Sequence, residues 1–359
     1  EVDIPESFAG QEAFLSLERV NMESQLWLDG ESVGRPIVEL SAPHVYALPS
    51  LMPGRHVLTL RLDNRPLMTN GTWASGYSVD TQGYWIGVAG RMELVCAPAW
   101  RLDGAEIFPD ETGVTAQLIM VSTLHMPPAL AEGVVTLTAT APDGRTLPPQ
   151  TTPVKLFTHR QRVACRYEIA DPVYWDEFNP ALYQLHVRAE FGEHVCEGDY
   201  TFGLRTVRRQ GRTMLLNGRP LALRGTIDCA QFPLTGYPPT DLATWQERMQ
   251  TIKSYGLNHV RFHSWCPPEA AFQAADEAGI YVQVEMPLWL NRDINMPEVG
   301  DDPIHRAYYT LEAQTIAKRY GNHPCFLLFS CANETQGDFE LLDDIVRGLK
   351  AVDDRRLYT

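Results

Sequence analysis

Several common signatures are missing from this sequence of 359 residues. Its seven cysteines contain no Cys-x-x-Cys pair, their number is odd and their spacing is scattered, so neither a disulfide framework nor a zinc site is expected. No apolar run reaches the roughly 18 residues that a membrane-spanning helix needs. The chain opens with Glu1-Val2-Asp3, without an initiator methionine or a signal peptide, which indicates a removed leader or a start inside a longer gene product.

Positive charge is also scarce. The chain has 30 Lys and Arg residues against 45 Asp and Glu residues, which gives a formal net charge of −15. Such a surface repels phosphate backbones, so we expect no nucleic-acid partner. The apolar fraction of 44% is ordinary for a globular protein, and the length indicates two or three domains.

The first 200 residues contain short runs in which apolar and polar residues alternate. Turn signals such as Asp29-Gly30, Pro53-Gly54 and Asp143-Gly144 separate these runs. The pattern predicts β-sandwiches, with strands that include residues 13–17, 25–28, 56–62 and 133–139.

From about residue 221 the pattern changes to strands that alternate with helices, which implies a parallel sheet. We expect strands at 221–225, 257–263, 280–285 and 325–330, and helices at 241–255, 267–278, 304–320 and 339–351. Four such units are half of an eight-stranded barrel, and a fifth strand would begin at Leu357-Tyr358. An open half-barrel would leave two bare edges, so we expect the gene product to continue. The alternative is a small doubly wound domain, although no glycine-rich loop follows the first strand.

Several segments resemble glycoside hydrolase family 2, and they follow one another along the chain in the order that the family has. Residues 202–205 and 216–225 resemble the join between the family's immunoglobulin-like domain and its barrel, and residues 256–263 resemble its second barrel strand. Residues 322–334 resemble its fourth strand, which ends in the Asn-Glu pair of the acid/base. Upstream, residues 28–34 are similar to the sugar-binding jelly roll, and residues 171–185 are similar to later strands of the second domain.

The resemblance implies three domains. Residues 1–102 would be a partial jelly-roll sugar-binding domain, residues 103–204 an immunoglobulin-like β-sandwich, and residues 205–359 the first half of a (β/α)8 TIM barrel. The family's nucleophile, a glutamate, lies on the seventh barrel strand, which is not in this chain. The resemblance therefore implies a retaining exo-β-glycosidase of the secreted or periplasmic type. This 359-residue fragment of it is expected to be inactive alone.

Glu334 is the predicted acid/base residue. Retaining glycosidases use two carboxyl groups, and barrel enzymes carry such groups at the carboxyl ends of their strands. Position alone also fits a solvated loop carboxylate; the preceding Asn333 and the resemblance favour catalysis. We expect the Glu334 side chain to point into a sugar-sized hollow near Arg261 and His263.

Five further residues are predicted to contact or support the carbohydrate. Asn333 would hydrogen-bond a sugar hydroxyl, and Arg261 and His263 share one face of their strand because Phe262 separates them. Arg261 could orient a carboxylate and His263 could contact the substrate; the alternatives are a structural ion pair and a core histidine. Glu285 ends the third predicted strand and Asp228 ends the first.

Aromatic side chains could stack on sugar faces, although tryptophan is also a common core residue. Trp289 is favoured over Trp265 and Trp85, and Tyr237 could line the same pocket. Met286-Pro287 lacks the extra ligands that a magnesium site needs, so we expect no metal and no cofactor.

Two other functions remain open. A non-catalytic carbohydrate-binding protein fits the β domains but does not need the Asn333-Glu334 pair. An adhesion or scaffold protein built from sandwiches leaves the strand–helix half unexplained. The identity of the sugar depends on loops and later strands.

Overall fold

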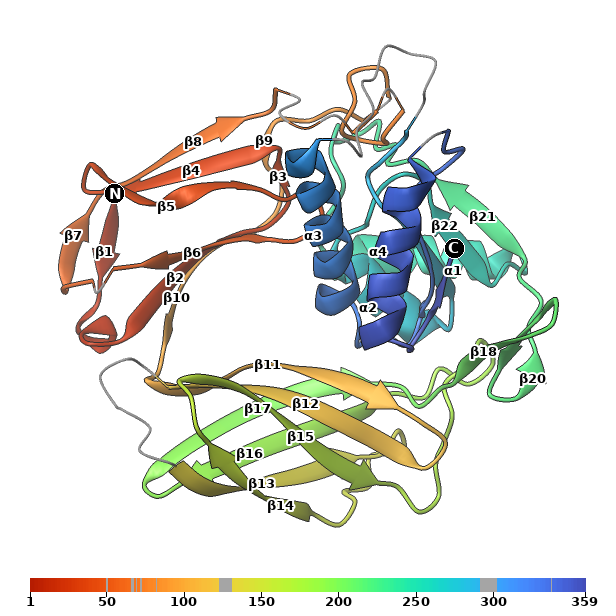
Figure 1. Ribbon diagram of the computed structural model, residues 1–359, viewed down its shortest axis with the longest axis horizontal. Coiled ribbons are helices and arrows are strands. Elements are labelled where there is room, and N and C mark those ends of the chain that lie inside the picture. Colours follow the sequence, from red (N-terminus) through yellow and green to blue (C-terminus); the bar gives the residue numbers. More distant parts are fainter. Residues whose placement is uncertain are drawn as a thin grey trace. The chain divides into compact units, whose positions relative to one another are not determined.

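A computed structural model gives the fold of the chain (Figure 1). It describes residues 1–49, 51–65, 68, 70–71, 73–81, 83–122, 131–290, 302–336 and 338–359. The chain groups into two compact units. The first comprises residues 1–96, 223–320 and 325–359, and the second comprises residues 97–222 and 321–324. The finer domain boundaries after residues 102 and 204 stay predictions.

The amino-terminal part of the first unit consists of small antiparallel sheets, ordered β10-β2-β6, β5-β4-β8, β1-β7 and β3-β9. Their strands are β1 (Val2–Ile4), β2 (Glu12–Leu17), β3 (Val20–Asn21), β4 (Glu23–Leu28), β5 (Glu31–Val38), β6 (His44–Leu48), β7 (Gly54–His56), β8 (Leu58–Asp63), β9 (Gly87–Val88) and β10 (Met92–Ala97). A short 3-10 helix, η1 (Glu6–Phe8), follows β1. Alternate residues of β2, namely Ala13, Leu15 and Leu17, are buried in one hydrophobic core, which explains the period of two in the sequence.

One predicted strand of this region is wrong. Residues 56–62 form the ends of two strands, because β7 pairs with β1 while β8 pairs with β4. At the break, the backbone N–H of Val57 donates to Asp29 Oδ1 (2.7 Å) and the Val57 carbonyl accepts from the Asp29 N–H (2.8 Å). The turn aspartate thus provides the hydrogen bonds that a continuous ladder would have supplied.

The carboxyl-terminal part of the first unit is a five-stranded parallel sheet in sequential order. Its elements are β21 (Gly225–Asp228), α1 (Leu242–Ser254), β22 (His259–Phe262), α2 (Glu269–Ala278), β23 (Tyr281–Glu285), α3 (Pro303–Arg319), β24 (Phe326–Ser330), α4 (Phe339–Val352) and β25 (Leu357–Tyr358). The predicted alternation of strands and helices is confirmed, and so is the fifth strand. Asp241 caps α1 by accepting from the Thr244 N–H (2.9 Å), and Gly279 ends α2 in the left-handed conformation, with φ of 69°.

The first barrel strand begins later than predicted. Residues 221–225 were expected to form it, but β21 starts at Gly225. Leu221 instead donates its N–H to the Met214 carbonyl (2.9 Å), which extends the pairing of β19 with β20. The apolar run at 221–223 therefore ends a hairpin and does not start the barrel.

The second unit is a β-sandwich of a three-stranded and a four-stranded sheet, ordered β11-β12-β15 and β14-β13-β16-β17. The strands are β11 (Trp100–Pro109), β12 (Gly113–Ser122), β13 (Ala131–Thr140), β14 (Gln150–Leu156), β15 (Arg160–Glu168), β16 (Tyr183–Phe191) and β17 (His194–Phe202), followed by β18 (Val207–Gln210), β19 (Thr213–Leu216) and β20 (Arg219–Pro220). Their inward-facing side chains, such as Val135, Leu137, Leu185 and Val187, form one core. All pairs are antiparallel, which confirms the predicted sandwich class.

A fully buried arginine in the first unit lies between its β-sheets and the parallel sheet. Arg19 Nη1 donates to the carbonyls of Leu40 (3.4 Å) and Ser41 (3.2 Å), and Nη2 donates to the carbonyl of Cys266. Its guanidinium also lies 5.7 Å from the centre of the Trp265 ring. A buried cation is tolerated only where such partners replace water.

Tyrosine hydroxyls and a glutamate hold the same segment. Tyr77 donates to the Leu40 carbonyl (3.1 Å), and Tyr320 of the parallel sheet's helical layer donates to the Ser41 carbonyl (2.5 Å). The buried Glu312 on α3 accepts from the Leu40 N–H (3.3 Å). Residues 40 and 41 therefore attach the amino-terminal sheets to α3 through backbone hydrogen bonds.

Within the described residues, no helix is long and apolar enough to cross a membrane, and no group of three or more His, Cys, Asp and Glu side chains is placed to hold a metal ion. All seven cysteines are free thiols, and five of them are buried.

Candidate active site

The parallel sheet carries polar side chains on the face that points away from its helices. Arg261 on β22 pairs in register with Gln283 on β23, and Glu285 pairs with Ser330 on β24, so these four side chains point to the same side. Gln283 Nε2 donates to Ser330 Oγ (3.0 Å), and Ser330 Oγ bonds to Thr359 Oγ1 (2.6 Å). The polar column rises toward the carboxyl ends of the strands, where barrel enzymes carry their catalytic groups.

A forked hydrogen bond from Arg261 joins three strands at this end. Its Nε donates to Glu285 Oε1 (2.5 Å), and its Nη2 donates to Asn333 Oδ1 (2.5 Å). The other oxygen of Glu285 accepts from the backbone N–H of Ser264 (2.7 Å). The Glu285 side chain is 1% exposed and that of Arg261 is 34% exposed, so the pair is largely removed from water. The structure therefore brings three of the predicted residues into one rigid group.

Glu334 follows directly on the anchored Asn333. Asn333 is 6% exposed, whereas Glu334 is exposed and has φ of 42°, in the left-handed region. Within the described chain, no hydrogen bond or ion pair joins its carboxylate to Arg261 or His263, and its orientation toward a sugar-sized hollow stays a prediction. Two residues later the Gln336 N–H donates to the Leu290 carbonyl (2.9 Å), which holds the far side of this turn. The structure thus fixes the backbone on both sides of Glu334 and leaves its carboxylate accessible.

His263 and Trp289 lie against each other, with ring centres 5.4 Å apart and planes inclined by 53°. A distant part of the chain holds Trp289 in place. The backbone N–H of Trp289 donates to the Asn70 carbonyl (2.7 Å), and Asn70 Nδ2 donates to the Pro287 carbonyl (2.6 Å). The Nδ1 atom of His263 is buried and has no hydrogen-bond partner in the described residues. The aromatic wall that the two rings form suits packing against the apolar face of a sugar ring.

Asp228 lies apart from this group. In register with Phe262, its carboxylate faces the helices, where Oδ2 accepts from Arg248 Nη1 (2.9 Å) and Oδ1 accepts from the Ala230 N–H (2.9 Å). Burial raises the pKa of the Asp228 carboxyl, although these two partners oppose the rise. Its contacts are those of a strand-to-helix tether.

The remaining aromatic candidates are also placed. Trp265 is fully buried, donates Nε1 to the Asp228 carbonyl (3.0 Å) and packs edge-on against Phe262, as a core residue does. Trp85 is buried beside Tyr77. Tyr237, in the segment between β21 and α1, is 42% exposed.

Sequence reasoning missed several members of the site. Gln283 could have been found, because it precedes Glu285 by two residues and must share its face. Ser264 acts through its backbone N–H, which leaves no mark on residue type. Asn70 acts over 217 residues of chain, and no local pattern indicates such a contact.

Comparison with known proteins shows which family this chain resembles. Residues 207–359 match the family model described as the TIM barrel domain of glycosyl hydrolases family 2. A β-galactosidase from Halalkalibacterium halodurans is 24% identical over 99% of this chain, which covers 35% of that protein. A β-galactosidase from Pectobacterium atrosepticum is 27% identical over 50% of this chain and 17% of its own length.

Two solved structures share the fold. A Bacteroides uniformis β-glucuronidase 2 superposes with a TM-score of 0.80 at 17% identity, over 99% of this chain and 45% of that chain. A family 2 β-galacturonidase from Eisenbergiella tayi, bound to galacturonate, superposes with a TM-score of 0.80 at 18% identity, over 98% of this chain and 61% of that one. The chain spans about a third of the length of the H. halodurans relative. The chain thus resembles glycoside hydrolase family 2: residues 207–359 match the family's barrel domain, and the antiparallel sandwiches followed by part of a parallel α/β barrel share the fold of its solved structures.

Proposed function

We propose that this chain supplies the acid/base side of the active site of a retaining exo-β-glycosidase that hydrolyses terminal β-linked sugars. The observation that carries the proposal is the Arg261 fork, which holds Glu285 and Asn333 together at the carboxyl ends of β22, β23 and β24. This group fixes the backbone next to Glu334 at the edge of the sheet where barrel catalysis takes place.

In this mechanism Glu334 protonates the leaving glycosidic oxygen and then removes a proton from the water that releases the sugar. Asn333 is oriented for recognition: its Oδ1 accepts from Arg261, so its Nδ2 is the end that donates to a sugar hydroxyl. His263 and Trp289 offer an aromatic wall to the sugar ring.

The family resemblance assigns the nucleophile to a glutamate on the seventh barrel strand. Within the residues that the structure describes, the parallel sheet has five strands, β21 to β25, and none of them is a seventh strand. We therefore expect the 359-residue chain alone to hydrolyse no nitrophenyl β-glycoside.

The test uses the complete gene product and two leaving groups. Glu334→Gln should lower kcat/KM for an alkyl β-glycoside by roughly 10²–10⁴, since the leaving oxygen then lacks its proton donor. Dinitrophenolate leaves without protonation, so with a dinitrophenyl glycoside the variant should still form the glycosyl-enzyme, whereas the attack of water on that intermediate should fail. Azide needs no general base and should restore turnover with a β-glycosyl azide as product.

The matched control is Glu340→Gln, which changes an exposed carboxylate at the start of α4 and should leave activity unaltered. Full activity of the Glu334→Gln variant on alkyl glycosides would refute the assignment. Sugar binding by the complete product without any hydrolysis would favour the alternative, a non-catalytic carbohydrate-binding protein.

A further inference from the structure

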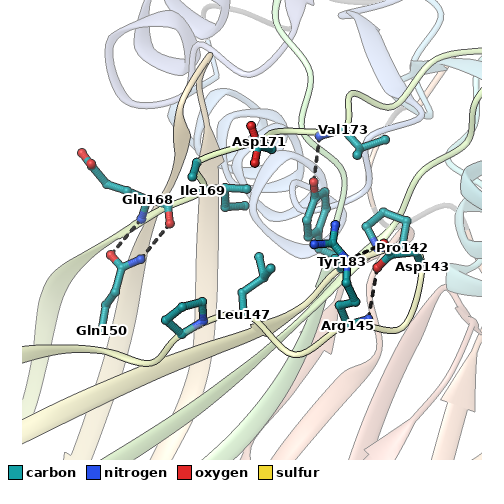
Figure 2. A pocket seen from close by; sticks show the side chains of 13 residues that line it. Pro142, Asp143, Arg145, Leu147, Gln150, Glu168, Ile169, Asp171, Val173 and Tyr183 are labelled. Atoms are coloured by element: carbon teal, nitrogen blue, oxygen red, sulfur yellow. Dashed lines mark hydrogen bonds and ion pairs between the residues drawn. The ribbon is translucent and has the colours of Figure 1, made fainter.

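A cavity of about 450 Å³ opens in the β-sandwich of the second unit (Figure 2). Its walls come from the connection between β13 and β14, the segment that follows β15, and the first residue of β16. This volume lies within the range of roughly 300–1,000 Å³ that is typical of small-ligand sites. None of the residues predicted from the sequence to bind substrate lies here.

One side of the cavity is apolar and held in place. Leu147, Ile169 and Tyr183 line it, and Tyr183 is 1% exposed. The Tyr183 ring stacks on Phe202 with centres 5.2 Å apart, and its hydroxyl accepts from the Val173 N–H (2.8 Å). A wall fixed by packing and by a hydrogen bond needs little reordering to bind a ligand.

The polar side offers two groups of opposite charge. Arg145 spends its Nε on Asp143 Oδ2 (2.6 Å), which leaves its two terminal nitrogens without a partner in the described residues. Asp171 also lines the cavity and has no hydrogen bond or ion pair in the described residues, although its charge acts on Arg145. Figure 2 shows both side chains at the cavity, on separate segments of its wall. Gln150 is occupied, since its amide bonds to both backbone groups of Glu168 (2.7 and 3.0 Å).

We propose that this cavity binds a single uncharged sugar ring. A ring of this kind has an apolar face for Leu147, Ile169 and Tyr183, and edge hydroxyls that both donate and accept. Hydroxyls can therefore accept from Arg145 and donate to Asp171 at the same time. A cationic ligand would be repelled by Arg145 and an anionic ligand by Asp171, whereas the hydroxyls of a neutral polyol can bond to both side chains.

The experiment records methyl NMR spectra of the full chain during titration with galactose, glucose, mannose, glucuronate and glucosamine. The uncharged sugars should shift the methyl signals of Leu147, Ile169 and Val173 with a dissociation constant of roughly 1–10 mM, and the two charged sugars should bind more weakly. A free sugar and the end residue of a glycan share this chemistry. Methyl β-glycosides and β-linked disaccharides distinguish them, because only a glycan site binds the disaccharide at least as well.

The test variant replaces both polar ends, with Arg145→Ala and Asp171→Ala together; both side chains are exposed, so the fold should persist. We expect at least tenfold weaker binding. The matched control is Arg212→Ala with Glu193→Ala, an exposed pair of the same charges outside the cavity. The proposal would be overturned if saturating sugar left the methyl chemical shifts unchanged, or if the test variant showed the same shift changes as the wild type. Because these methyls report only on the second unit, the result is independent of hydrolysis at Glu334.

Discussion

The ion pair between Arg261 and Glu285 makes a quantitative prediction. Arg261→Met leaves the Glu285 carboxylate, which is 1% exposed, with the Ser264 N–H as its remaining donor. Removing one partner of a buried pair costs about 3–5 kcal/mol, and the 34% exposure of Arg261 places this case near the lower end, at about 3 kcal/mol. Loss of the bond to Asn333 adds roughly 1 kcal/mol, so we expect the free energy of unfolding to fall by about 4 kcal/mol.

A double-mutant cycle isolates the pair. Glu285→Gln removes the charge that needs Arg261, so the double variant should be much more stable than the sum of the two single changes implies. We expect a coupling free energy of about 2–3 kcal/mol, measured by urea unfolding together with hydrogen exchange of residues 259–264, because urea does not screen charges. The control cycle is Arg347 with Asp343, an exposed pair on α4, which should give less than about 0.5 kcal/mol.

Arg261→Lys separates charge from geometry. A single ammonium group cannot serve Glu285 and Asn333 in the same fork, so this variant should keep the ion pair and lose the bond to Asn333. A coupling as small as that of the control pair would refute the reasoning, since the fork would then be solvated and could not position Asn333.

Three further predictions concern the first unit. Gly71→Ala should displace Trp289 and destabilise the fold in urea unfolding, because the added Cβ would lie 1.8 Å from the Trp289 carbonyl oxygen. The control is Gly10→Ala, which is also at positive φ but would have nothing within 4 Å of its Cβ; it should show only the backbone cost of about 1 kcal/mol. Arg19→Met should lower the unfolding free energy by about 3–5 kcal/mol and speed hydrogen exchange around residues 40–41, and wild-type stability would contradict this. Burial, with the nearby Glu312 charge, raises the pKa of Glu39 to about 7, so folding stability should decline as the pH rises from about 4.5 to 7. The decline should be on the order of 2 kcal/mol, and Glu39→Gln should remove it in unfolding curves measured across that pH range.

The elements that the sequence predicted well carry their signals locally. Asp241 and Gly279 mark the ends of helices through side-chain capping and a left-handed turn, both of which depend on the residue type itself. The alternation of strands and helices in the carboxyl-terminal part, which the structure confirms, is likewise read from local hydrophobic periodicity. The Asn333-Glu334 pair came from the resemblance to the family.

The errors arose where distant contacts decide the structure. The apolar run at residues 221–223 has the composition of a barrel strand, but a hydrogen bond to Met214 extends the preceding hairpin. Substrate contact by Asp228 stays a prediction; its bond to Arg248 on α1 is a further contact that no local pattern indicates. Neither the accessibility of Glu334 nor the grip of Asn70 on Trp289 has a local signature.

The backbone at Glu334 has an evolutionary consequence. Its φ of 42° is unfavourable for any residue with a β-carbon and costs nothing for glycine, so Glu334→Gly should strengthen the fold by about 1 kcal/mol. On the role proposed for Glu334, the same substitution removes the proton donor, so a screen for thermal resistance alone would favour variants that lack it. Keeping glutamate at this position would then require selection on turnover.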